Sequence, residues 1–339
     1  SSLFLLGTVF VYRFTGTLTM TAPTGLEGKG LAVAFFLMVA ALVLELKPFP
    51  ANGWALDVYE RSHPAISALI SGASATAGLY ALDKILHLSG ARSAKAVALI
   101  GLISFLGANL LALKQERSRR LLGYSSIAQI GLMVGVIGLR PVLGTATWPI
   151  LAGLLVTHVL AKTGLFYLSG LIDKEETSAW ARFKRCPMLL FMAGTFLFAL
   201  AGFPPFPGFL AKWDLVLTLG KADMTLWIVL ILTGSLLEAV YLFRWLGVII
   251  KGESEAERPP LSLHQILPAF SAALLLLAGG GYAFFHRGFH PGWGHGLLAV
   301  ALGLFLLDFL PAALKNILSL AALAGWAWKM APLLQDFRF

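Results

Sequence analysis

The sequence is poor in charged residues and almost free of cysteine. Asp, Glu, Lys and Arg make up 13% of the 339 residues, about half the roughly 25% that is usual for a soluble domain. So little charge cannot cover a water-exposed surface, which argues against a soluble enzyme. The single cysteine, Cys186, excludes an internal disulfide and a cysteine-based metal or cluster site. The chain also has no C-x-x-C pair and no glycine-rich nucleotide loop, so no cofactor is expected.

The sequence instead contains many long runs of apolar residues. Hydrophobic residues make up 58% of the chain, in runs close to the ~20 residues that a helix needs to cross the hydrocarbon core of a bilayer. The pattern predicts an all-α, polytopic transmembrane helical bundle, a single membrane domain over residues 1–339, embedded in the lipid bilayer. About eleven spans are expected, at 1–14, 29–48, 63–87, 95–114, 124–140, 147–171, 187–220, 225–250, 264–286, 294–313 and 316–333.

The net charge of +9 is explained by short basic loops and does not call for nucleic acid as a partner. Basic loops at 115–123, 172–186 and 251–262 fall on one side of the predicted membrane, and short loops rich in Lys and Arg remain cytoplasmic. The first residues, SSLFLLGTVFVYRF, lack a basic n-region and an initiator methionine. They are therefore not expected to be a signal peptide, and the chain is expected to be a fragment or a processed product.

The most informative residues are ionisable groups inside predicted spans. Each costs about 2.5–3.5 kcal/mol at the bilayer centre on insertion scales, so several of them together indicate a function. Simpler explanations exist for some: Lys47 could snorkel to an interface with Glu45 as its ion-pair partner, and Glu238 could form a structural pair with Arg244. His158 and Lys162 are harder to dismiss, because residues four apart share one helix face. The candidate proton-transfer residues are Lys212, Lys162, His158, Glu45 and Lys47, with Glu238 in support.

Two proline clusters predict helix breaks beside these charges. The stretch FPPFPGFLAKWD, residues 203–214, places Pro204, Pro205, Pro207 and Gly208 just before Lys212. The stretch LELKPFP, residues 44–50, places Pro48 and Pro50 after Glu45 and Lys47. Proline interrupts a helix and frees backbone carbonyls, which a lysine and water can satisfy at membrane depth.

Four blocks of this sequence resemble the antiporter-like membrane subunits of respiratory complex I, a family shared with Mrp-type sodium/proton antiporters and membrane-bound hydrogenases. They are FPANGWALDVYERSHPAISALISG (49–72), LLALKQERSRRLLGYSSIAQIG (110–131), THVLAKTGLFYLSG (157–170) and AGFPPFPGFLAKW (201–213). The order and spacing of the blocks extend the resemblance over residues 1–250.

The resemblance implies a bundle of two inverted five-helix repeats, each with a broken helix. Residues 1–114 would then hold the remainder of the first repeat and the start of the second, 95–250 the second repeat, and 264–339 extra C-terminal helices. It also implies roles for three residues. Lys212 would lie near the proton exit, Lys162 would be the central lysine, and His158 would be the histidine one turn earlier.

Other positions depart from the family pattern. By spacing to Trp54 and Asp57, the lysine of the first broken helix is expected at position 45, where this chain has Glu45. The next helix has Thr76 in place of the usual lysine and Ser71 in place of the histidine of some relatives. Hydroxyls cannot hold a charge at neutral pH, so the first half of the path is expected to be altered or inactive. The family's loop histidine and proline are replaced by Asn52 and Leu56, and the basic loop with Arg119, Arg120 and Tyr124 is interpreted as a cytoplasmic anchor.

The resulting hypothesis is a proton-translocating membrane subunit of a redox-driven ion pump. Its expected partners are sister antiporter-like subunits and a redox arm that carries the cofactors, and its expected location is a bacterial or archaeal cytoplasmic membrane or an organelle inner membrane. Two alternatives remain at this point: an Mrp-type cation/proton antiporter subunit, in which sodium replaces or accompanies the proton, and a degenerate structural membrane subunit.

Overall fold

The computed structural model describes residues 2–18, 29–89, 91–172, 174–252 and 263–286. The chain forms two compact units, Ser1–Gly280 and Gly281–Phe339, and the account below concerns the first. Its described residues are helical throughout and contain no strand, only an isolated antiparallel bridge between Arg117 and Glu176. The predicted all-α membrane bundle is confirmed. The two spans predicted at 294–313 and 316–333 lie outside the described residues.

The first helices lead into the first break. Helix α1 (Ser2–Thr15) packs on α2 (Lys29–Glu45), and α2 ends just before the LKPFP stretch. Lys47 then adopts a positive φ of 61°, and the Phe49–Pro50 peptide bond is cis. The short helix α3 (Gly53–Arg61) follows, so the chain doubles back before it enters the next span.

The next span is not a uniform α-helix. It begins at α4 (Pro64–Leu69), where the His63 side chain accepts a hydrogen bond from the backbone of Ala65, and it ends as α5 (Ala75–Ser89). Between them lies a single π-helical turn, η1 (Ile70–Ser74). A π-helical turn widens the helix and weakens its regular hydrogen-bond ladder, and such turns are frequent at functional sites.

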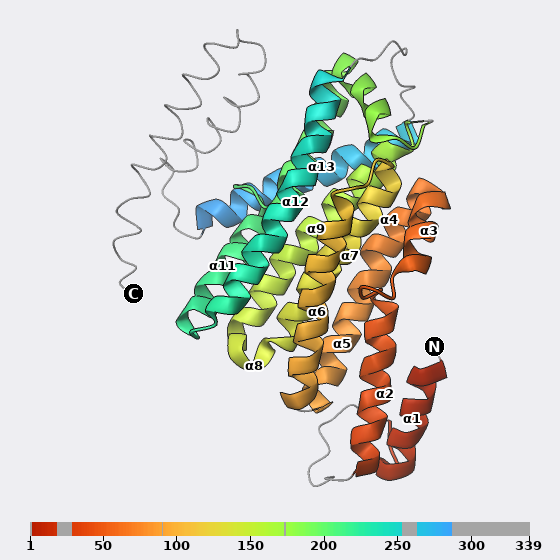
Figure 1. Cartoon of the computed structure of the whole chain (residues 1–339), viewed down its shortest axis with the longest axis vertical. Helices are drawn as coiled ribbons and strands as arrows, with labels where there is room; N and C mark the ends of the chain where they lie inside the picture. Colours follow the sequence, from red (N-terminus) through yellow and green to blue (C-terminus); the bar gives the residue numbers. More distant parts are fainter. Residues whose placement is uncertain (1, 19–28, 90, 173, 253–262, 287–339) are drawn as a thin grey trace. The chain divides into compact units, whose positions relative to one another are not determined.

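Helices α6 (Ala91–Ala112) and α7 (Ser118–Gly138) form the centre of the unit (Figure 1). The whole apolar stretch of α7 is buried. Glycines allow the two helices to approach closely: a Cβ on Gly101 would lie 2.6 Å from the carbonyl oxygen of Gly131, and one on Gly131 would lie 2.8 Å from the amide of Phe105. Small residues at such contacts let helix backbones pack in a membrane.

Substituting Gly101 with alanine is expected to lower the melting temperature of the chain. The new methyl group would overlap the backbone of α7, which cannot move aside as a flexible side chain could. The matched control is Gly194→Ala on a buried turn of another helix, where a Cβ meets nothing within 4 Å and alanine is favoured over glycine by about 1 kcal/mol. Thermal unfolding in detergent should rank Gly101→Ala below the unsubstituted protein and Gly194→Ala level with it or above.

The remaining helices surround α7 and contain the second break. The short α8 (Arg140–Leu143) and the 3-10 turn η2 (Gly144–Ala146) lead into α9 (Thr147–Ser169), which packs on α7. The 3-10 segment η3 (Thr177–Arg185) precedes α10 (Pro187–Ala201), and α11 (Pro207–Lys221) resumes after the proline cluster. Helices α12 (Thr225–Lys251) and α13 (Leu263–His286) complete the described part.

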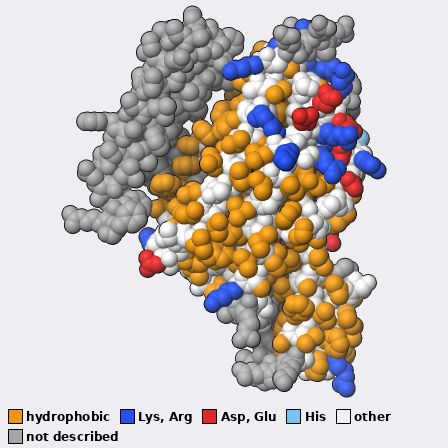
Figure 2. All heavy atoms as spheres, in the orientation of Figure 1, with side chains coloured by type: hydrophobic (Ala, Val, Ile, Leu, Met, Phe, Trp, Pro, Cys, Tyr) orange, Lys and Arg blue, Asp and Glu red, His pale blue; other side chains and the backbone are white. Residues whose placement is uncertain are grey.

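Surface composition fits a membrane location. Among the described residues, six helices are long and apolar enough to cross a bilayer. Figure 2 shows a flank that is almost wholly hydrophobic and a concentration of Lys, Arg, Asp and Glu toward one end. That end includes the loop before α7, the C-terminal end of α12 and η3, whose Lys184 donates to the carbonyl of Gly252. Two of the three basic loops predicted on one side of the membrane, 115–123 and 172–186, thus lie at this end, whereas most of the third, 251–262, lies outside the described residues.

Candidate functional site

Buried polar side chains from six elements and one loop form a series through the unit, which we call the polar axis. Each member is at most 4% exposed except Lys212, whose side chain is 12% exposed. Polar groups at this depth require partners, because no water is available to the backbone or side chains in the hydrocarbon region. The polar axis consists of Lys47, Tyr59, Ser71, Ser126, His158, Lys162, Gln129, Glu238 and Lys212.

An ion pair lies at the second break. Lys212 Nζ is 3.0 Å from Glu238 Oε2, and Gln129 Nε2 donates to both carboxylate oxygens of Glu238 at 2.7 Å. The break explains the placement of the lysine. Gly202, with φ of +78°, ends α10, and the stem of Lys212 passes beside it, within 3.4 Å of where a Cβ would be. The break thus leaves room for Lys212 to reach a carboxylate on α12.

The suggested structural pair of Glu238 with Arg244 was wrong. Arg244 does not contact it and instead donates to the backbone carbonyls of Leu113, at 2.5 Å, and Gln115, at 3.0 Å. Residues 238 and 244 are six apart, which puts them on different faces of α12, since one turn takes 3.6 residues. Glu238 therefore belongs to the polar axis, whereas Arg244 hydrogen-bonds backbone carbonyls just after the C-terminal end of α6.

His158 and Lys162 occupy the centre of the axis from one face of α9. Lys162 is fully buried and donates from Nζ to the carbonyl of Leu122 at 3.2 Å. His158 Nε2 lies 3.1 Å from the carbonyl of Ser71 and 3.4 Å from its hydroxyl. His158 Nδ1 has no hydrogen-bond partner, although it is buried. The spacing of four residues places both side chains against neighbouring helices, as expected from the sequence.

At the first break, the structure separates the two candidate residues. Glu45 is exposed at the end of α2, whereas Lys47 is 2% exposed and donates from Nζ to Tyr59 Oη at 3.2 Å. The Lys47 ammonium also lies 5.3 Å from the Tyr59 ring centroid and 5.9 Å from that of Trp54, within range of cation–π attraction. Lys47, and not the residue at position 45, thus holds the position comparable to Lys212.

The two hydroxyl residues of the following span differ as well. Ser71 is fully buried in the π-helical turn, with its hydroxyl 2.5 Å from that of Ser126. Thr76 is half-buried and donates to the carbonyl of Gly72 within its own helix, so it is not part of the polar axis.

The remaining predicted residues lie in or near the charged end. Arg120 binds Asp57 at 3.1 Å and Glu60 at 2.7 Å, and Arg117 binds Glu60 at 2.5 Å. Burial alone would raise the pKa of Glu60, but its hydrogen bonds to Arg117 and Arg120 outweigh this and hold the pKa below its usual value. Arg119 donates to the carbonyl of Ser62 at 3.4 Å. The contacts tie α3 to the start of α7, and Tyr124 lies buried just beyond.

Sequence reasoning missed several buried polar residues. Gln129, Tyr59 and Ser126 of the polar axis were not singled out, nor was Asp83, which is buried and binds Arg140 at 2.8 Å. An amide inside the otherwise apolar span GYSSIAQIGLM was a usable signal for Gln129, because a buried amide requires partners. Tyr59 and Glu60 lie in DVYER, which has the composition of a solvent-exposed loop.

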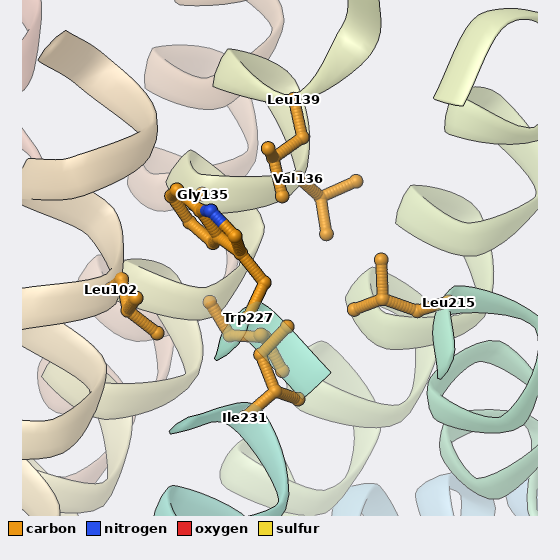
Figure 3. A pocket seen from close by; sticks show the side chains of 8 residues that line it. Leu102, Gly135, Val136, Leu139, Leu215, Trp227 and Ile231 are labelled. Carbon is orange, nitrogen blue, oxygen red and sulfur yellow. The ribbon is translucent and has the colours of Figure 1, made fainter. Parts of the chain in front are cut away.

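Small apolar hollows lie between helices in the described part of the chain. Figure 3 shows a hollow of about 10 Å³ between α6, α7, α11 and α12, lined by Leu102, Leu215, Trp227 and Ile231 among others. It is apolar and holds at most one water molecule. The described residues also include no group of three His, Cys, Asp or Glu that could bind a metal ion.

Comparison with known proteins agrees with this geometry. The family model described as NADH:quinone oxidoreductase/Mrp antiporter, transmembrane, matches residues 1–238, which include both breaks and the whole polar axis. The chain belongs to this family. Similarity to NADH-quinone oxidoreductase subunit N of Desulforudis audaxviator is 28% identity over 282 residues, covering 76% of this chain and 55% of the relative. NADH-quinone oxidoreductase subunit N 1 of Chloroherpeton thalassium is 32% identical over 271 residues, which cover 74% of this chain and 55% of the relative.

A solved member of the family has the same fold. Respiratory complex I from Thermus thermophilus includes a chain that aligns with a TM-score of 0.69 and 29% identity, covering 82% of this chain and 63% of that one. This chain thus spans little more than half the length of the curated relatives it matches. Like them, it is an integral membrane protein of a family whose members are subunits of multi-subunit membrane complexes.

Proposed function

We propose that this chain is a proton-translocating subunit of a redox-driven ion pump related to respiratory complex I. The observation that carries the proposal is the buried ion pair of Lys212 with Glu238, supported by Gln129, directly beside a helix break. Ionisable groups inside a membrane protein mark ion and proton pathways. The names of the relatives and the resemblance of the four sequence blocks support the same function.

Protons would move along the polar axis in steps between basic side chains. Lys212 would exchange protons with water at the break when its contact with Glu238 loosens, because backbone carbonyls and water can replace that contact there. Lys162 and His158 stand between this pair and Lys47. Electron transfer would take place in partner subunits. Its electrostatic effect on the polar axis would determine whether each lysine carries a proton.

The partners and the location follow from this function. We propose sister antiporter-like subunits and a redox arm as neighbours, in a bacterial or archaeal cytoplasmic membrane or an organelle inner membrane. Both breaks place a buried lysine in the polar axis, although only the second lysine has a carboxylate within ion-pair distance among the described residues. The two halves of the path are therefore expected to respond differently to substitution.

Replacing Lys212 with alanine is expected to reduce proton transport several-fold. The experiment uses the complex isolated in mild detergent and reconstituted in proteoliposomes, with NADH and a quinone as the redox pair and a pH-sensitive dye as the readout. The matched control is Lys221→Ala, an exposed lysine on the same helix, which should transport normally. Normal proton transport by an assembled Lys212→Ala complex contradicts the proposal and favours a structural role.

The same vesicles distinguish the proposed redox-driven function from the antiporter alternative. A cation/proton antiporter subunit needs no redox partner and moves protons in exchange for sodium, so its proton signal should appear on imposing a sodium gradient without NADH. Proton uptake that requires electron transfer and persists without sodium supports the proposed function.

A further inference from the structure

We propose that three hydroxyl groups, those of Tyr59, Ser71 and Ser126, form a bridge that conducts protons between Lys47 and His158. The inference rests on the proposed function and concerns the first half of the path, where Ser71 and Thr76 predicted an altered or inactive channel. The structure places three buried hydroxyl groups at this point. A hydroxyl relays protons without ionising, because it accepts one proton as it donates another.

The contacts follow one another from the break to the centre. Lys47 Nζ donates to Tyr59 Oη at 3.2 Å. The Tyr59 hydroxyl lies close enough to the hydroxyls of Ser71 and Ser126 to interact with them, and these two serine hydroxyls lie 2.5 Å from each other. Ser71 Oγ is then 3.4 Å from His158 Nε2. The three hydroxyl residues and His158 are each at most 1% exposed, so protons on these groups do not exchange directly with bulk water.

The π-helical turn accounts for this placement. It spans Ile70–Ser74 and brings the Ser71 carbonyl to 3.1 Å from His158 Nε2. Next to it, Gly72 packs against α9, where a Cβ would lie 3.4 Å from the Val159 side chain, an ordinary contact distance. The turn therefore presents both an acceptor, the carbonyl, and a donor, the hydroxyl, to the same imidazole nitrogen. Helix distortions of this kind are found mostly at functional sites.

That arrangement gives His158 a partner in both of its neutral forms. With a proton on Nε2, the ring donates to the Ser71 carbonyl; with Nε2 bare, the Ser71 hydroxyl can donate to it. The opposite nitrogen, Nδ1, is buried without a partner and is free to take up a proton from the side of Lys162, which lies one helical turn away. His158 can therefore accept a proton on one nitrogen and release one from the other.

The transfer conserves protons at every step. A proton arrives at His158 Nδ1, and the Nε2 proton passes to Ser71 Oγ while the Ser71 hydroxyl proton moves to Ser126 Oγ. The Ser126 hydroxyl proton moves to Tyr59 Oη, and the Tyr59 hydroxyl proton joins the neutral amine of Lys47. Each hydroxyl ends with one proton, as it began. Rotation of the hydroxyls and of the imidazole ring restores the starting state, and the sequence runs equally in reverse.

Ser71→Ala in the reconstituted complex tests the bridge. It is expected to lower proton transport per electron about tenfold, because a positioned proton-transfer group contributes at least this much, while Ser71→Thr, which keeps the hydroxyl, retains most of it. Tyr59→Phe should cause a similar loss and keeps the ring that stacks on Phe166 at 5.5 Å, so it remains informative if Ser71→Ala fails to assemble. The double variant should lose no more than either single one, since both interrupt one route.

The matched control is Ser169→Ala. Ser169 is a buried serine whose hydroxyl donates to the carbonyl of Phe166, away from the polar axis. If Ser71→Ala and Tyr59→Phe transport protons as Ser169→Ala does while Lys212→Ala is impaired, the bridge is overturned and the proposed function stands. If Lys212→Ala also transports normally, the proposed function itself fails.

Discussion

Replacing Glu238 with alanine is expected to destabilise the protein more than any other single substitution in the polar axis. Glu238 is fully buried and is the hydrogen-bond partner of both Lys212 and Gln129. Its loss would leave the ammonium of Lys212, 12% exposed, and the amide of Gln129 without partners. Breaking a buried ion pair on one side typically costs about 3–5 kcal/mol, because a charge remains without compensation. Thermal unfolding in detergent, followed by tryptophan fluorescence, should show a fall in melting temperature of several degrees.

A double variant separates the charge from the packing. In Lys212→Met/Glu238→Leu both charges are replaced by apolar side chains of similar length, and such replacements are often neutral or stabilising. We expect the melting temperature to recover in part, because the unpaired charge is gone while the Gln129 amide still lacks its partner, and proton transport to stay low. A double variant as unstable as Glu238→Ala would show that the pair contributes to stability through packing, and it would contradict this account.

The fold was largely predictable from the sequence because membrane helices are specified locally. The apolar runs at 147–171 and 225–250 became α9 and α12 nearly residue for residue, since every backbone group in lipid must be satisfied within its own helix. The proline cluster at 203–207 predicted the break between α10 and α11 for the same local reason. The π-helical turn at Ile70–Ser74 lies in an apolar stretch with no proline, so the sequence carries no such signal for it.

The candidate site was predictable only in part. His158, Lys162 and Lys212 stood out because charge inside an apolar run is rare. Their partners did not, since a glutamine or a tyrosine costs less at depth and attracts less notice, and pairing across helices is a tertiary property. The Glu45 and Lys47 pair illustrates the limit. Both are charged and two residues apart, and only the backbone turn at Lys47, with its φ of 61°, decides which of them is buried.

Replacing Lys162 with methionine is expected to stop proton transport while leaving the protein at least as stable. Lys162 is fully buried, and within the described part of the chain its ammonium donates one hydrogen bond, to the Leu122 carbonyl at 3.2 Å. Burying an ammonium with a single neutral partner is unfavourable, and methionine fills a similar volume without that cost. Lys162 thus lowers the stability of the folded protein. A destabilising residue of this kind indicates a functional role rather than a structural one.

The functional loss should be large because no neighbouring group can replace the amine. His158 lies on the same face of α9 but faces Ser71, and Glu238 is already engaged by Lys212 and Gln129. A missing proton-transfer group typically costs about a hundredfold or more in rate, so the share of proton uptake per electron that passes through this chain should be lost, while sister subunits would keep theirs. Lys162→Arg is the matched comparison: it keeps the charge but cannot release a proton, so it should also fail to transport. Normal transport by Lys162→Met would contradict a path through the centre of α9, and a large fall in its melting temperature would show that the lysine is structural.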